Sequence, residues 1–241
     1  MIVPGRVSLI TAVYNKQKYV AQSIEASLAM KYDDLEIVII NDGSTDKSGE
    51  IIERYSSDPR VRIITQANQG SPAALHNAIK ASTGEFFIRE DADDWSEPNY
   101  IEETMPRMVE QDVAAVCTHV MLEGDVNYVT RCESFGDPRY AAGIEQLKLQ
   151  NWIPNALTRR SVYDQTPGFD PRVGIYSDWG LWIEITKRGW KIALVDKVLH
   201  HYRILYKSDS NNETSKIVGK HEENFKKIRL LHPDLWPGET A

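Results

Sequence analysis

Short apolar runs alternate with helical patterns through the first ninety residues of the chain. The runs at residues 7–13, 35–40, 61–64 and 85–88 are rich in β-branched or aromatic side chains, which is typical of buried strands. Between them, apolar residues at helical spacing predict one helix through Ile24 and Leu28, a second around Ile51, Ile52 and Tyr55, and a third over residues 71–81. This alternation predicts a mostly parallel sheet with helices on both faces.

From Asn99 onward the pattern changes to a mixture of helices and strands. Strands are expected at 114–121, with 127–130 as a hairpin partner, and at 155–158 and 190–195. Helices are expected through Met105 and Met108, and over residues 145–150, 178–188 and 213–231. Gly189 is the expected C-cap of the helix before it. No repeat or linker divides the chain, so we expect one α/β domain over residues 1–241.

Composition excludes several classes of protein. A chain of 241 residues with 41% hydrophobic content is typical of a soluble globular domain. The net charge of −7 argues against nucleic-acid binding, which needs clustered basic residues. Cys117 and Cys132 form no CxxC pair, which argues against zinc and favours a reducing compartment. No apolar run reaches the roughly 20 residues of a transmembrane segment, so we expect a cytoplasmic protein, with peripheral membrane contact left open.

Four acidic residues follow the fourth predicted strand: Glu90, Asp91, Asp93 and Asp94. Like charges this close repel one another and raise each other's pKa values unless a cation lies among them. Mg²⁺ and Mn²⁺ prefer oxygen ligands, and Mg²⁺ typically takes one or two carboxylates together with water and substrate phosphate. The cluster therefore predicts a site for a metal and a phosphate. A solvated acidic loop is the alternative.

Polar residues also follow the first and second predicted strands, at Tyr14-Asn15 and Asn41-Asp42. Ligands of parallel sheets bind beyond the carboxyl ends of the strands, so we expect these segments and the acidic cluster to share one crevice. The polar stretch at residues 41–46 is also compatible with an ordinary Asx-rich turn. If it is functional, the carboxylate of Asp42 accepts a nucleobase N–H, while the acidic cluster serves the diphosphate of the same nucleotide.

Together these segments resemble the family 2 glycosyltransferases, which have the GT-A fold, invert configuration and use nucleotide sugars. The resemblance covers about residues 5–205. It is carried by the segments 7–15, 39–46, 84–88, 91–95, 168–170, 177–182 and 202–203. It implies a Rossmann-like central sheet, with a nucleotide-sugar-binding half at about 5–98, an acceptor-binding half at about 99–210, and a C-terminal helix and tail at 211–241.

The resemblance assigns roles on the donor side by position. Thr11, Ala12 and Tyr14 would line the base pocket, and Asp42 would hold the base, which is most often uracil in relatives. Asp91 would approach the ribose, and Asp93 or Asp94 would bind Mn²⁺ or Mg²⁺. The remaining donor contacts would come from Asn77 or His76, near ribose or phosphate, and from Arg203, near phosphate; His76 could equally be a helix-surface residue.

Asp178 falls on the position of the family's general base. It would take the proton of an acceptor hydroxyl while that oxygen attacks the anomeric carbon opposite the leaving phosphate. Alternatively, it is an acid at a helix N-terminus that complements the helix dipole. Two departures keep a catalytically inactive nucleotide-sugar-binding module open: Ser177 replaces the usual Glu, and Leu205 replaces a common His.

The acceptor is expected to be a glycan or a lipid-linked sugar, recognised by the second half of the chain. Aromatic and polar candidates there are Trp152, Asn155, Arg159, Arg160 and Tyr176, which are equally compatible with structural packing. His200 and His201 either line the crevice or pack at a strand end. The basic residues Lys220, Lys226, Lys227 and Arg229 form a solvated helix face or touch lipid head groups. A sugar-nucleotide pyrophosphorylase is disfavoured, because residues 11–16 are not a glycine-rich basic phosphate loop.

Overall fold

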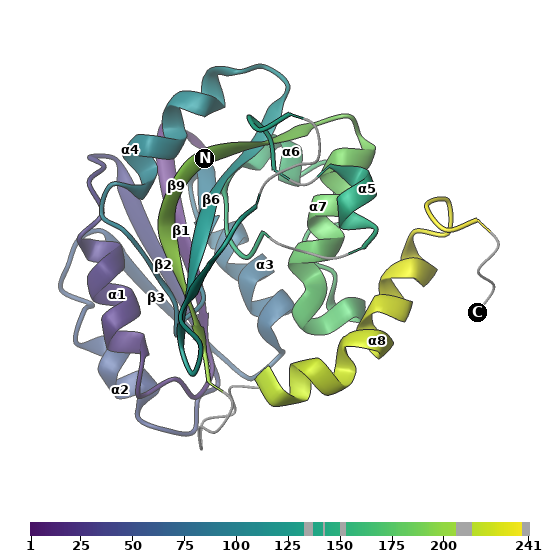
Figure 1. The fold of residues 1–241 in the computed structure, drawn as a ribbon. Coiled ribbons are helices and arrows are strands. Elements are labelled where there is room, and N and C mark those ends of the chain that lie inside the picture. The colour runs from purple at the N-terminus through teal and green to yellow at the C-terminus, as the bar shows by residue number, and fades with distance from the viewer. Residues whose placement is uncertain (133–136, 142, 150–152, 206–213, 238–241) are drawn as a thin grey trace.

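The computed structural model describes residues 1–132, 137–141, 143–149, 153–205 and 214–237. In this part of the chain, nine strands join in one sheet with the order β3-β2-β1-β4-β8-β6-β9-β5, and β7 pairs with β6. Helices cover both faces (Figure 1): α1, α2 and α4 pack on one apolar cluster, and α3, α5, α7 and α8 pack on the other. The prediction of a sheet covered on both faces is therefore confirmed.

The first half follows the predicted alternation. Its elements are β1 (Val3–Val13), α1 (Val20–Leu28), β2 (Leu35–Asp42), α2 (Ser48–Glu53), β3 (Val61–Gln66), α3 (Ser71–Ala81) and β4 (Gly84–Arg89). Strands β3, β2, β1 and β4 are all parallel. In β2, Ile37 and Ile39 belong to one apolar cluster and Val38 and Ile40 to the other, as the two-residue period of a strand buried on both faces requires.

The second half adds antiparallel strands to this sheet. Its elements are β5 (Trp95–Ser96), α4 (Tyr100–Thr104), the 3₁₀ turn η1 (Met105–Val109), β6 (Val113–Gly124), β7 (Tyr128–Thr130), α5 (Ile144–Leu147), β8 (Leu157–Arg159), α6 (Arg160–Tyr163), the 3₁₀ segment η2 (Pro171–Tyr176), α7 (Ser177–Lys187), β9 (Lys191–Ile204) and α8 (Thr214–Leu231). The predicted hairpin of β6 and β7 is confirmed. Gly189 has φ 83° just after α7, as its predicted place at the helix end requires.

Several predicted elements have different bounds in the structure. The helix predicted through Met108 ends at Thr104 and continues as a 3₁₀ turn, because Pro106 cannot donate a backbone hydrogen bond. Strand β9 runs on to Ile204, nine residues beyond the prediction, since the polar pair Asp196-Lys197 interrupts the apolar pattern where its register with β6 shifts. The predicted starting residue of the C-terminal helix, Glu213, lies outside the described residues.

The sheet brings the ends of β9 and β4 together. Short strand β5 directly follows the acidic cluster and pairs with β9, with Trp95 opposite His201 and Ser96 opposite His200. Tyr202 and Arg203, the next residues of β9, therefore lie beside the acidic cluster. Among the described helices, none has the length and apolar character needed to cross a bilayer.

Candidate active site

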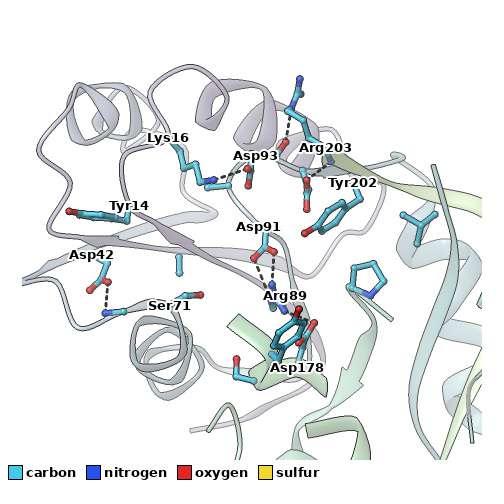
Figure 2. A pocket seen from close by; sticks show the side chains of 18 of the residues that line it. Tyr14, Lys16, Asp42, Ser71, Arg89, Asp91, Asp93, Asp178, Tyr202 and Arg203 are labelled. Carbon is cyan, nitrogen blue, oxygen red and sulfur yellow. Dashed lines mark hydrogen bonds and ion pairs between the residues drawn. The ribbon is translucent and has the colours of Figure 1, made fainter. Parts of the chain in front are cut away.

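A cavity of about 730 Å³ lies beyond the carboxyl ends of β1, β2 and β4 (Figure 2). Eight predicted site residues line it: Ala12, Tyr14, Asp42, Asp91, Asp93, Asp94, Asp178 and Arg203. They come from both halves of the chain, so the fold gathers segments that lie up to 191 positions apart, from Ala12 to Arg203.

Two predicted donor-binding residues do not line this cavity. Thr11 is buried within β1, whose alternation turns Ala12 toward the cavity instead. Asn77, on α3, donates its amide to the Gln66 side chain at 2.8 Å. Gln66 in turn donates to Asp42, so Asn77 supports the Asp42 carboxylate through one intermediate residue. His76 is exposed on α3 and does not line the cavity either.

Asp42 is the last residue of β2, and three hydrogen bonds fix its carboxylate. Oδ1 accepts from the Gln66 amide at 2.7 Å and from the Gln69 N–H at 2.9 Å, and Oδ2 accepts from the Gly70 N–H at 2.9 Å. Gly43 permits this arrangement, because it has φ 70° and a Cβ there would lie 2.8 Å from the Asn68 backbone nitrogen. Since a carboxylate oxygen has two lone pairs, Oδ2 keeps acceptor capacity for a ligand N–H.

Arg89 lies between two carboxylates of the cavity, although nothing in the sequence analysis assigned it a role. Its guanidinium binds both oxygens of Asp91 through Nε and Nη2, and Nη1 lies 3.1 Å from Oδ2 of Asp178. Figure 2 shows the three side chains together. Burial alone would lower the pKa of Arg89, but the charges of Asp91 and Asp178 outweigh it and raise that pKa, so the guanidinium stays charged.

Asp178 is the second residue of α7, and its buried carboxylate faces the cavity. Oδ1 accepts a hydrogen bond from the Trp179 N–H at 2.8 Å. Burial raises the pKa of Asp178, and the nearby Arg89 opposes that rise. A carboxylate with this environment is a stronger base than one in water, which suits proton abstraction from a hydroxyl.

The acidic cluster carries its own cation. Lys16 follows β1 and reaches across to Asp93, with Nζ 2.7 Å from Oδ2 (Figure 2). Asp94 is buried and accepts the Arg203 N–H at 2.8 Å. Burial and the charges of Asp93 and Asp91 raise the pKa of Asp94 well above its ordinary value, so the cluster has a shortage of positive charge.

Arg203, near the end of β9, binds the acidic cluster through hydrogen bonds. Its Nε donates to the Asp93 carbonyl at 3.0 Å, and its guanidinium lies 4.8 Å from the Tyr19 ring centre and 5.0 Å from that of Trp95. Cation–π contacts on both rings hold the side chain in place. Arg203 thus lines the cavity while its polar groups are largely engaged by protein.

The donor set fits a divalent cation that shares its ligands with a diphosphate. In the described part of the chain, no group of three or more His, Cys, Asp or Glu side chains is arranged to hold a metal ion. Asp93 and Asp91 nevertheless face the cavity beside buried Asp94, and burial together with their two charges raises the pKa of Asp94, an arrangement that another positive charge would relieve. Mg²⁺ needs only one or two protein carboxylates when substrate phosphate and water complete its shell.

A second polar cluster lies behind the cavity and is sealed from water. It consists of Glu90, Ser96, Asn155 and His200, all at most 5% exposed. Ser96 donates to Glu90 at 2.7 Å and lies 3.1 Å from Nδ1 of His200, which also lies 3.4 Å from Glu90. Burial raises the pKa of Glu90 to about 8 and lowers that of His200 to about 3, so near pH 7 this contact joins two neutral groups.

The other candidates divide between packing and the cavity. Arg159 and Arg160 donate to the backbone carbonyls of Met108 and Ser82, and His201 stacks on Trp95, with ring centres 4.8 Å apart. Tyr176 lines the cavity beside Asp178. Trp152 and the side chain of Lys220 lie outside the described residues, whereas Lys226 is exposed on α8.

The sequence analysis did not identify two residues of the cavity, Lys16 and Arg89. For Arg89 the available signal was a charged residue at the end of a buried strand.

Comparison with solved structures shows the same fold. The Staphylococcus aureus protein TarS (residues 1–349) matches with a TM-score of 0.75 and 16% identity, over 98% of this chain and 67% of that one. The mannosyltransferase PcManGT from Pyrobaculum calidifontis, solved with GDP-Man and Mn²⁺, matches with a TM-score of 0.67 and 16% identity, over 98% and 76% of the two chains. Another TarS structure contains UDP-GlcNAc. These likenesses confirm the predicted GT-A glycosyltransferase fold.

Sequence relatives agree with this fold. The putative glycosyltransferase EpsH of Bacillus subtilis is 39% identical over 165 residues, which are 66% of this chain and 48% of EpsH, so the chain spans about half of that relative. An uncharacterized glycosyltransferase of Nostoc sp. is 29% identical over 92% of this chain and 70% of its own length. The profile described as "Glycosyl transferase family 2" matches residues 8–171, more than half of the chain. The chain therefore belongs to glycosyl transferase family 2.

Proposed function

We propose that this chain is an inverting glycosyltransferase that moves a sugar from a nucleoside-diphosphate sugar, with UDP-sugars favoured, to a hydroxyl of a glycan or lipid-linked acceptor. The observation that carries the proposal is one cavity with three acidic positions: Asp42 on one side, Asp178 on the other, and the acidic cluster between them. We place the reaction in the cytoplasm, at the inner face of a membrane when the acceptor is lipid-linked.

The base pocket is formed by Asp42, Ala12 and Tyr14. The free acceptor capacity of Asp42 selects a base that presents a ring N–H, as uracil and guanine both do. The Tyr14 side chain is 41% exposed and points into the cavity above Asp42, where its ring can cover the base (Figure 2). Structures of fold relatives contain UDP-GlcNAc or GDP-Man, which supports a nucleotide donor without deciding between the two bases.

In the proposed reaction, Asp178 accepts the proton of the acceptor hydroxyl. A bond forms between that oxygen and the anomeric carbon, while the bond from this carbon to the diphosphate oxygen breaks on the opposite face. A single displacement of this kind inverts the anomeric configuration. The ammonium of Lys16 lies within the acidic cluster, where it can neutralise an incoming phosphate.

Asp93, together with Asp91 or Asp94, would hold Mn²⁺ or Mg²⁺. When bound, the metal supplies positive charge to the departing diphosphate, an electrostatic contribution that commonly exceeds the roughly 10²–10⁴-fold of acid–base catalysis. The protein residues arrange the site for that charge: Arg203 fixes the acidic cluster through the Asp94 carboxylate and the Asp93 carbonyl.

The test is a panel of UDP-, GDP- and other nucleoside-diphosphate sugars, assayed with Mn²⁺ for hydrolysis and for transfer to glycan and lipid-linked acceptors. We expect turnover with at least one donor and a loss of roughly 10²–10⁴-fold in Asp178→Asn. Asp164→Asn, at an exposed acid outside the cavity, is the matched control and should keep wild-type rates.

A catalytically inactive nucleotide-sugar-binding module is the second candidate. It is favoured by Ser177, a buried residue directly before Asp178 that replaces the glutamate common in the family. The same panel decides between the two: donor binding by calorimetry without any turnover, and with no effect of Asp178→Asn, would establish the binding module instead.

A further inference from the structure

Arg89 is the last residue of β4, and it touches the donor side and the acceptor side of the cavity at once. Its side chain is 14% exposed, and the two carboxylates that it contacts, Asp91 and Asp178, are 87 residues apart in sequence. No role in the donor or acceptor chemistry proposed above explains why a buried guanidinium belongs at this point. Removing a cation from water is costly unless it is paired, as Arg89 is with two carboxylates.

The two contacts of Arg89 differ in kind. With Asp91 it forms a two-point contact, in which Nε lies 3.1 Å from Oδ1 and Nη2 binds Oδ2. With Asp178 it forms a single-point ion pair, in which Nη1 lies 3.1 Å from Oδ2. The first contact fixes the guanidinium plane, because a planar fork on a carboxylate allows little rotation. The second then places a positive charge at a fixed point beside Asp178.

We propose that Arg89 is a positioning residue for the general base: anchored by Asp91, it holds the Asp178 carboxylate toward the acceptor and keeps it ionised. This inference rests on the proposed function, since it assigns Arg89 a task only if Asp178 is the base. It also joins the two halves of the reaction, because the same guanidinium contacts Asp91 beside the donor site.

The groups around Asp178 decide in which direction removal of Arg89 would shift its protonation. Arg89 from β4 is the cation that faces it; Asp91 from the acidic cluster and the hydroxyl of Tyr176 before α7 are the other titratable neighbours. Burial and Asp91 favour the protonated form of Asp178, and Arg89 opposes both. Without the guanidinium, Asp178 holds its proton to higher pH, and the enzyme loses its base at the acid side of the pH profile.

The experiment compares wild type, Arg89→Met and Arg89→Lys by kcat and kcat/KM from pH 5.5 to 9.5. In Arg89→Met, the acid limb of the kcat/KM profile is expected to move to higher pH, so that the loss at pH 6 exceeds the loss at pH 9 by about tenfold or more. Arg89→Lys is expected to keep the acid limb near its wild-type place but to lower kcat, because an ammonium is a point charge without the two-point contact.

A control variant removes a part-buried arginine that lies outside the cavity. Arg107 binds Glu110 and the carbonyl of Leu194, so Arg107→Met should change the thermal transition without moving the acid limb. If Arg89→Met folds, and both its acid limb and its kcat equal those of wild type, the positioning role is wrong while the glycosyltransferase stands. If Arg89→Met does not fold, Arg89→Lys decides, and an unchanged kcat then overturns the proposal.

Failure of the proposed function gives a different result. In that case wild type itself turns over no donor of the panel, or Asp178→Asn retains wild-type turnover, whatever the behaviour of the Arg89 variants.

Discussion

Glu90 and Asp91 are adjacent acids in the same loop, but their carboxyl groups lie in opposite environments. Asp91 faces the cavity and forms an ion pair with Arg89. Glu90 faces the interior, is 1% exposed, and meets Ser96, Asn155 and His200. One acid is stabilised by a buried cation, and the other is held as a neutral group by burial, which raises its pKa to about 8.

Within residues 90–94, the acids that face the cavity therefore differ in environment from the acid that packs in the interior. The cavity-facing acids have cationic partners, Arg89 and Lys16, which suits groups that must remain charged to meet a ligand. The interior cluster instead connects β5 and β9 with Glu90, just after β4, and Asn155, just before β8, through neutral hydrogen bonds, so that the acidic loop is held in place from behind. Four predictions test this division.

The largest effect is expected on the cavity side, from Asp93→Asn. Removing the charge that faces Lys16 and the proposed diphosphate site should lower turnover by roughly 10²–10³-fold, the cost of one well-placed electrostatic contact. Turnover measured against Mn²⁺ concentration checks it, with exposed Asp33→Asn as the control. Undiminished turnover at saturating Mn²⁺ would show that Asp93 is not part of the phosphate and metal site.

On the interior side, Glu90→Gln should flatten the dependence of stability on pH. The folded-state pKa of Glu90 is raised from 4.5 to about 8, so its contribution is present below pH 4.5 and is lost as pH rises through about 8. At about 1.4 kcal/mol per pKa unit, wild type should lose up to a few kcal/mol over this window that the variant keeps. Thermal melts from pH 5 to 8 measure this, and parallel pH slopes for the two proteins would contradict it.

A smaller effect is expected from Lys16→Met, which removes the cation from the acidic cluster. Without donor, Mn²⁺ should bind the variant more tightly, because Asp93 no longer has a competing partner. With donor, nucleoside-diphosphate affinity should fall about tenfold, or about 1.4 kcal/mol, because one phosphate contact is lost. Calorimetry with Mn²⁺ alone and with UDP measures both, and exposed Lys18→Met is the control. Equal Mn²⁺ affinity in wild type and Lys16→Met would show that Lys16 does not compete with Mn²⁺ for Asp93.

The smallest effect is expected from Ser96→Ala. The hydroxyl donates to Glu90 at 2.7 Å in the sealed cluster, so its loss should cost about 1 kcal/mol of the free energy of unfolding, the typical net contribution of one intramolecular hydrogen bond. Urea unfolding at pH 7 checks this. Donor affinity should be unchanged; a variant that loses donor affinity but no stability would place Ser96 on the cavity side of the division.

The sequence was sufficient to predict the parallel half of the sheet and its crevice, because strand and helix periods and the polar strand ends are local signals. It could not place β8 between β4 and β6, since antiparallel pairing of Leu157–Arg159 depends on partners some 70 and 40 residues away. For the same reason it did not reveal Arg89 and Lys16. A basic residue beside an acid-rich segment is common, and only the fold shows that Arg89 meets Asp178 and that Lys16 crosses to Asp93.

The ion pair of Lys16 and Asp93 also bears on the kinetic order of substrate addition. A free enzyme that carries its own counter-ion gains little from capturing a bare metal ion, whereas a metal–nucleotide complex brings both a cation for Asp93 and an anion for Lys16. We therefore expect donor and metal to enter as one species, ahead of the acceptor. Initial-rate and product-inhibition measurements should then show an ordered mechanism. The metal–donor complex should be the first substrate to bind, and the nucleoside diphosphate the last product to leave.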